Sequence, residues 1–155
     1  MKYRILSVLL FALIVSACGN VSTPTSPTVS TDAPNVATEP VIVEDQASLV
    51  AALEASAATV ETGEPVTQVF FSPEGSIIKV NGADVQVFEY ESAEAMENEA
   101  SQVAPDGGSI GTTMVTWVDT PHFYKTGRII VLYIGSDETI LNLLESVLGP
   151  QFAGR

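Results

Sequence analysis

The stretch that decides the fold is SIIKVNGADVQVFEYE, residues 76–91. Two runs rich in β-branched and aromatic residues flank the dipeptide Asn81-Gly82. This dipeptide suits a type I′ turn, because both central residues of that turn need a positive φ. The stretch therefore predicts an antiparallel hairpin.

The second run of this hairpin carries apolar residues on both of its faces. Successive side chains of a strand point to opposite sides, so Val85 and Val87 share one face while Phe88 and Tyr90 share the other. A strand with two apolar faces is typical of the inside of a sheet. We therefore expect this strand to be central.

Three segments around the hairpin have apolar residues at helical spacing, which predicts helices over residues 48–58, 92–104 and 136–150. Each begins with a side chain that can accept a hydrogen bond from a free backbone N–H group. The expected N-caps are Ser48, Ser92, and either Ser136 or Asp137.

Further strands are predicted at residues 67–72, 112–118 and 128–135, and residues 119–127 are expected to form a turn between the last two. The resulting order is helix, three strands, helix, two strands, helix. This order predicts a single α+β domain, an antiparallel sheet of about five strands with helices on one face. Residues 79–101 and 125–146 also share the order of lysine, turn, strand and helix, which raises the alternative of an internal duplication.

The chain begins with a segment that has the layout of a secretory signal peptide, residues 1–17. Lys2 and Arg4 give a positive start, an uncharged apolar run follows, and Ser16-Ala17 are small. The run from Ile5 to Ala17 would span about 20 Å as a helix, whereas the hydrocarbon core of a bilayer is about 30 Å thick. A cleaved signal is therefore expected rather than a spanning helix.

The segment ends in Val15-Ser16-Ala17-Cys18, which resembles the lipobox of bacterial lipoproteins. The resemblance implies that Cys18 receives a diacylglyceryl group and becomes the first residue of the mature chain. It also implies an exported protein whose partner is the bacterial cell membrane, held through the lipid anchor at Cys18. The side of the membrane on which the protein would lie, outer face or periplasmic side, depends on the type of cell envelope. Cys18 is the only cysteine, so no disulfide is expected.

Residues 18–44 are rich in Ser, Thr and Pro, which predicts a disordered tether between the anchor and a globular domain at residues 45–155. The chain holds 6 Lys and Arg against 19 Asp and Glu, a net charge of −13. Nucleic-acid binding is disfavoured, because it needs a basic patch to neutralise phosphates.

The stretch PHFYKTGRIIVLYIGSDETILNLLESVLGPQFAGR, residues 121–155, together with NGADVQVFEY, residues 81–90, resembles a domain of exported bacterial lipoproteins of unassigned function. This resemblance implies an α+β architecture and an exported location. It implies no catalytic residue.

His122 is the only histidine, so metal sites with several His or Cys ligands are excluded, and we expect no cofactor. A small hydrolase would have to use His122 with Asp119. The chain has no Gly-x-Ser-x-Gly motif to supply the nucleophile.

The best candidate for a binding site is the segment 117–128, because it contains several aromatic residues and an Arg. Residues of these types are enriched in binding hot spots. The alternative is that its aromatic residues belong to the core. We expect a non-enzymatic module that binds an envelope protein or component; the alternatives are a solute-binding lipoprotein and the hydrolase. The candidate binding residues are Trp117, Asp119, His122, Phe123, Tyr124, Lys125 and Arg128.

Overall fold

The computed structural model describes residues 42–155. The predicted signal peptide, Cys18 and the tether up to residue 41 lie outside the described residues. None of the helices in residues 42–155 combines the length and the apolar character needed to cross a membrane. In chain order the elements are α1 (Gln46–Ala55), β1 (Val60–Val66), β2 (Gly75–Val80), β3 (Ala83–Glu89), α2 (Ala93–Ala100), β4 (Ser109–Ile110), β5 (Thr113–Met114), β6 (Pro121–Thr126), β7 (Ile129–Ile134), α3 (Glu138–Leu148) and β8 (Ala153–Gly154).

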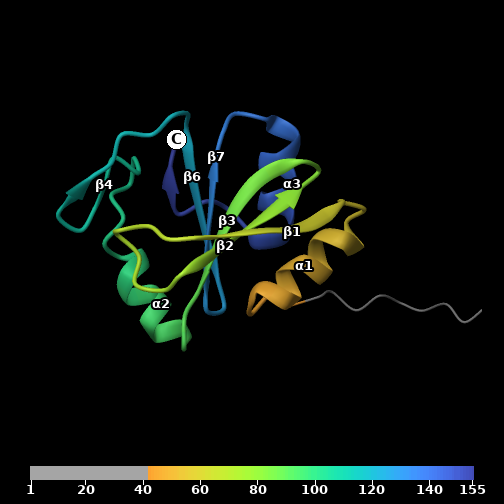
Figure 1. Ribbon diagram of the computed structural model, residues 1–155, viewed down its shortest axis with the longest axis horizontal. Coiled ribbons are helices and arrows are strands. Elements are labelled where there is room, and N and C mark those ends of the chain that lie inside the picture. Colours follow the sequence, from red (N-terminus) through yellow and green to blue (C-terminus); the bar gives the residue numbers. More distant parts are fainter. Residues whose placement is uncertain (1–41) are drawn as a thin grey trace, which may run out of the picture. The chain divides into compact units, whose positions relative to one another are not determined.

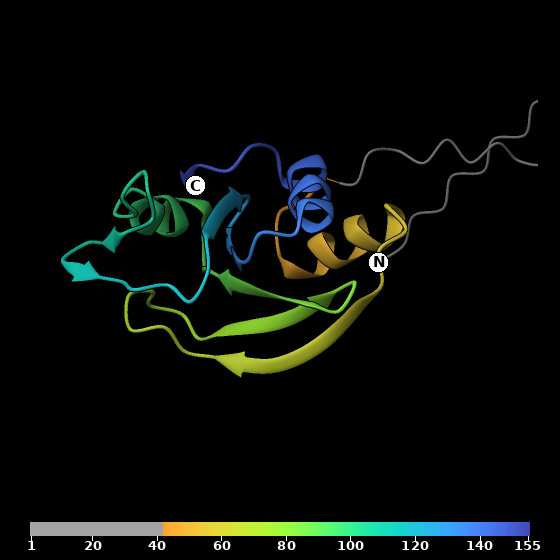
Figure 2. The ribbon, with the colours of Figure 1, turned by 90° about the horizontal axis from the view of Figure 1, so that it is seen from above.

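Six strands form one antiparallel sheet in the order β1-β2-β3-β7-β6-β8, and β4 pairs with β5 in a separate small hairpin. Figures 1 and 2 show this sheet as a curved layer with the helices packed around it. The predicted α+β class and antiparallel sheet are confirmed.

The hairpin predicted at Asn81-Gly82 is present between β2 and β3. Val80 pairs with Ala83, and the two turn residues have φ values of 51° and 88°. β3 lies between β2 and β7, so its predicted central position is also confirmed.

The hydrophobic core has two parts, one on each face of the sheet. α1 and α3 cover the face that carries Val85 and Val87, whereas α2 and the loops near it cover the face that carries Phe88. Figure 1 shows α1 and α3 near each other and α2 apart from them. The expectation of helices on one face thus holds for α1 and α3, while α2 packs on the opposite face.

Two predicted strands and one predicted turn differ from the structure. Residues 67–72 form a loop, and the strand lies at residues 60–66 instead, while residues 112–118 hold only the short β5. Residues 119–127, expected as a turn, contain β6, which pairs along its whole length with β7. The polar residues of β6 do not predict a buried strand. The strand is buried because neighbouring elements cover it, which its own composition does not indicate.

The caps agree with the sequence for two helices. Ser92 accepts a hydrogen bond from the N–H group of Ala95, and Asp137 accepts one from that of Thr139. For α1 the expected cap was wrong: Asp45 is the N-cap, and Ser48 is the third helical residue of a capping box. The two side chains each accept a hydrogen bond from the other residue's backbone N–H group.

β1 is one edge of the sheet and is irregular. Its pairing with β2 shifts between Thr62 and Pro65, and the charged residues Glu61 and Glu64 are exposed. A bulge of this kind bends the strand and interrupts its ladder of hydrogen bonds.

The proposed duplication meets an obstacle in the packing. The units β2-β3-α2 and β6-β7-α3 do have the same order, and β3 pairs with β7 in antiparallel fashion. A two-fold axis between antiparallel strands would place both helices on one face of the sheet. Because α2 and α3 pack on opposite faces, no such axis relates the two units.

Candidate functional site

The candidate binding segment is divided by β6, because successive side chains of a strand point to opposite faces. His122 and Tyr124 face α3, while Phe123 and Lys125 face α2 and the loops on the other side. The predicted residues are close in sequence, but in the structure they lie on both faces of the sheet.

Trp117 and Phe123 belong to an aromatic cluster. The two rings meet edge to face at 5.8 Å, and the Trp117 indole N–H donates a hydrogen bond of 2.7 Å to the carbonyl oxygen of Gly107. Phe123 is completely buried, so its side chain is not on the surface of this structure. The alternative, that the aromatic residues are core, holds for Phe123.

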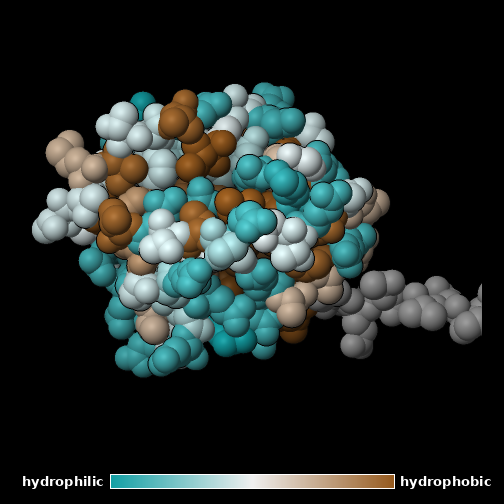
Figure 3. Space-filling model, in the orientation of Figure 1, coloured by the Kyte–Doolittle hydropathy of each residue, from teal (hydrophilic) through white to brown (hydrophobic). Residues whose placement is uncertain are grey.

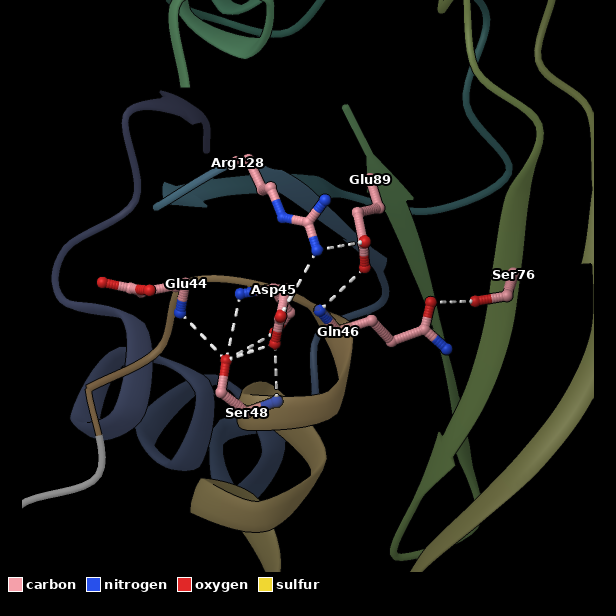
Figure 4. A network of polar contacts seen from close by, with 7 residues as sticks. All are labelled: Glu44, Asp45, Gln46, Ser48, Ser76, Glu89 and Arg128. Atoms are coloured by element: carbon pink, nitrogen blue, oxygen red, sulfur yellow. Dashed lines mark hydrogen bonds and ion pairs between the residues drawn. The ribbon is translucent and has the colours of Figure 1, made fainter. Parts of the chain in front are cut away.

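Lys125 and Arg128 make ion pairs within the domain. Lys125 Nζ lies 2.7 Å from Glu97 Oε2 and 5.1 Å from the centre of the Phe152 ring. Arg128 Nη2 lies 2.8 Å from Glu89 and 3.3 Å from Asp45, as Figure 4 shows. Both cations thus stabilise packing between elements.

Asp119 and His122 do not form the pair that a hydrolase would need. The Asp119 carboxylate is exposed and accepts a hydrogen bond from the N–H group of Thr120. It lines a cavity of about 430 Å³ together with Trp117. His122 instead lines a different cavity and bonds to Gln151.

This second cavity, which we term the β6–α3 cavity, has a volume of about 500 Å³. It lies between β6, α3 and the loop that follows α3. A volume of this size is within the range of about 300–1,000 Å³ that small-molecule sites occupy. Its lining residues are His122, Tyr124, Glu138, Leu141, Asn142, Glu145, Pro150 and Gln151.

The spacing of the lining residues explains how they meet. His122 and Tyr124 are two residues apart on β6 and share a face. Glu138, Asn142 and Glu145 are separated by four and three residues on α3, which places them on one side of a helix. The opposite side of α3 packs into the core, so the polar stripe faces the cavity.

His122 is buried and held in place on two sides. Its Nδ1 lies 2.7 Å from Gln151 Oε1, and its ring stacks on Tyr133 at 6.2 Å. An amide oxygen can only accept, so with this placement of the Gln151 amide the proton is on Nδ1. In the neutral ring, Nε2 is then a hydrogen-bond acceptor.

Tyr124 is the second buried polar residue of the cavity. Burial raises the pKa of its hydroxyl, and the nearby carboxylate of Glu145 raises that pKa further. The hydroxyl therefore stays protonated and able to donate a hydrogen bond near neutral pH.

Comparisons with protein-family models, with curated proteins and with solved structures give no match. The proposal for a binding role therefore rests on the geometry of the domain itself. In residues 42–155 no group of three or more His, Cys, Asp or Glu side chains is placed to hold a metal ion.

Six residues of the cavity lining were not among the sequence candidates: Glu138, Leu141, Asn142, Glu145, Pro150 and Gln151. The acidic residues of α3 have helical spacing, but the same spacing occurs on any solvated helix. These residues differ from those of an ordinary solvated helix in that they lie opposite β6, and this position is known only from the structure.

Exposed apolar side chains mark another part of the surface. Val69, Met114 and Val118 are each at least 87% exposed, and they belong to the loops and the small hairpin around Trp117. Figure 3 shows apolar side chains gathered on this side, over the region of β4 and β6. They are scattered among polar neighbours rather than joined into one continuous face.

Proposed function

We propose that the protein is an exported lipoprotein, anchored to the cell membrane through Cys18, whose globular domain is a non-enzymatic binding module. The resemblance of residues 15–18 to a lipobox supports the anchor. The β6–α3 cavity supports the binding role, because it is the place where buried polar side chains meet an open space.

The single observation that carries the binding role is the environment of His122. This residue is held by Gln151 and Tyr133, without the carboxylate that would orient it as a general base. The cavity lining has no Ser, Thr or Cys that could serve as a nucleophile. The arrangement favours recognition of a ligand over its hydrolysis.

The anchor is tested by labelling growing cells with an alkyne analogue of palmitate. We expect the full chain to be labelled and to sediment with membranes. Cys18→Ser should be unlabelled and released from the membrane fraction. Equal membrane attachment of the two chains would contradict the anchor.

The binding role is tested with the full chain, tagged at its C-terminus and recovered from mild detergent. Asn142→Trp places a bulky side chain at the β6–α3 cavity, and Asn98→Trp makes the same change on the exposed surface of α2. We expect mass spectrometry to find an envelope component, protein or small molecule, with the wild type and Asn98→Trp, and to find it lost from Asn142→Trp. Identical sets of retained components would overturn the cavity as the binding site.

A further inference from the structure

Within residues 42–155 most acidic side chains make no ion pair, and two of these side chains line the β6–α3 cavity. Lys79 pairs with Asp84, Lys125 with Glu97, and Arg128 with Asp45 and Glu89. Within residues 42–155, Glu138 and Glu145 have no such partner, and both line the cavity. The lining contains no Lys or Arg, so the cavity has two uncompensated carboxylates.

Two further polar groups of the cavity belong to buried residues and make no hydrogen bond. His122 is 6% exposed and Tyr124 is 3% exposed. Within residues 42–155, His122 Nε2 and the Tyr124 hydroxyl make no hydrogen bond. Every fully buried polar side-chain atom in this part of the chain does have a partner, so both groups must be reached from the space that these residues line.

The polar groups of the cavity match a ligand that donates hydrogen bonds and carries positive charge. Two carboxylates, and the Nε2 of a His122 ring that carries its proton on Nδ1, accept hydrogen bonds, and the Tyr124 oxygen can accept another. An ammonium group brings three donors and a guanidinium five, and neither can accept. Leu141 and Pro150 supply an apolar surface for an aliphatic chain.

We propose that the β6–α3 cavity binds an organic cation, an alkylammonium or alkylguanidinium group, through Glu138, Glu145, His122 and Tyr124. Such a group is carried by a free amine or by a Lys or Arg side chain of a partner protein. This inference rests on the proposed binding function and specifies its ligand chemistry. Binding gives these groups charge-assisted hydrogen bonds that they do not make within residues 42–155.

The test titrates the full chain in detergent with four probes of similar size: butylammonium, butylguanidinium, butanol and butyrate. We expect the two cations to raise the midpoint of thermal unfolding in a saturable way, and the alcohol and the carboxylate to leave it unchanged. Added salt should weaken the effect. Binding of butanol or butyrate equal to that of the cations would overturn the inference.

A pair of variants separates the cavity carboxylates from the overall charge. Glu138→Gln with Glu145→Gln keeps the volume of the side chains and removes both charges. Glu54→Gln with Glu94→Gln makes the same change in net charge on exposed positions of α1 and α2. We expect the first pair to weaken cation binding by about tenfold or more, which is about 1.4 kcal/mol, and the second to leave it unchanged. Equal affinities for the two pairs would overturn the inference.

A blocked tripeptide with a central lysine distinguishes the two sources of the cation. Tighter binding of the peptide than of butylammonium assigns the cavity to a partner protein, and weaker binding assigns it to a free amine. If no cation binds while Asn142→Trp still loses its envelope component, this inference fails and the proposed function stands. If Asn142→Trp and Asn98→Trp retain the same components, the proposed function fails.

Discussion

Nη2 of Arg128 lies 2.8 Å from Oε1 of Glu89, so the turn after β6 is joined to the end of β3. The other carboxylate oxygen of Glu89 accepts a hydrogen bond of 3.0 Å from the N–H group of Gln46, at the start of α1. The guanidinium also reaches Asp45, the N-cap of that helix, as Figure 4 shows. One cation therefore holds together the helix start and two strands.

Arg128→Met should lower the free energy of unfolding by about 1 kcal/mol, because it removes the cation paired with Glu89 while it keeps the apolar stem. Urea denaturation of the full chain in detergent measures this change. Lys79→Met removes an ion pair on the exposed hairpin and should have no measurable effect. If both variants lowered the free energy of unfolding equally, the Arg128 ion pairs would contribute no more to stability than the exposed pair of Lys79.

Asp45 should make stability depend on acid. Hydrogen bonds from the Ser48 hydroxyl and the Ser48 backbone N–H group, together with Arg128, lower the pKa of this carboxyl from its ordinary value of 3.8. The contribution is therefore complete above the pKa of the unfolded chain, and it is lost as the pH falls through the lower pKa of the folded chain. Asp45→Asn keeps an oxygen that can cap α1 but removes the charge.

We expect the wild type to be more stable than Asp45→Asn at pH 7, and the difference to shrink as the pH is lowered below 3.8. Urea denaturation at a series of pH values checks this. A difference that is constant with pH would show that the carboxylate charge contributes nothing.

Gly127→Ala should destabilise the domain much more than Gly82→Ala. Both glycines have a positive φ, 53° and 88°, so an alanine at either position costs about 1 kcal/mol of backbone strain. A Cβ at Gly127 would also overlap the backbone of Glu44, whereas nothing lies within 4 Å of one at Gly82. The difference between the free energies of unfolding of the two variants, measured by urea denaturation, therefore reports the overlap with the backbone of residue 44.

Hydrogen exchange gives a second readout for the same pair. The Arg128 N–H group donates to the Glu44 carbonyl oxygen at 2.8 Å, and the Thr126 hydroxyl donates to that of Val43 at 3.1 Å. We expect the Arg128 amide to exchange faster in Gly127→Ala and normally in Gly82→Ala. Unchanged protection in both variants would contradict the contact with residue 44.

Phe123→Ala should cost about 3–5 kcal/mol of stability, because it removes a completely buried ring that contacts Trp117 and Phe152. Val118→Ala is the control, since that side chain is 96% exposed. Thermal or urea unfolding of both measures the difference. A loss below 1 kcal/mol for Phe123→Ala would argue against this packing.

The parts of the fold that the sequence predicted have strong local signals. Asn81-Gly82 suits its turn by backbone conformation alone, and Ser92 and Asp137 cap helices through bonds to residues two or three positions ahead. The missed strands lack such signals. β1 contains Gly63 and Pro65 and is half exposed, so an edge position rather than apolar composition defines it.

β6 shows why the candidate site was predicted only in part. The sequence predicts a turn for its residues, and a turn lacks the alternation that places His122 and Phe123 on opposite faces of the sheet. The prediction did include His122 and Tyr124, but the other wall of the cavity comes from α3 and the loop after it. Gln151 lies 29 residues beyond His122, and no local pattern joins the two.

The irregular β1 has a consequence for how copies of this protein coexist. A free sheet edge is a template on which a second chain can add a strand. On the proposed anchor, copies of the protein would meet more often on a membrane than in solution. The bulge at Thr62–Pro65, the missing N–H group of Pro65 and the outward carboxylates of Glu61 and Glu64 all oppose such pairing. These features protect the β1 edge from adding a strand of a second copy of the chain.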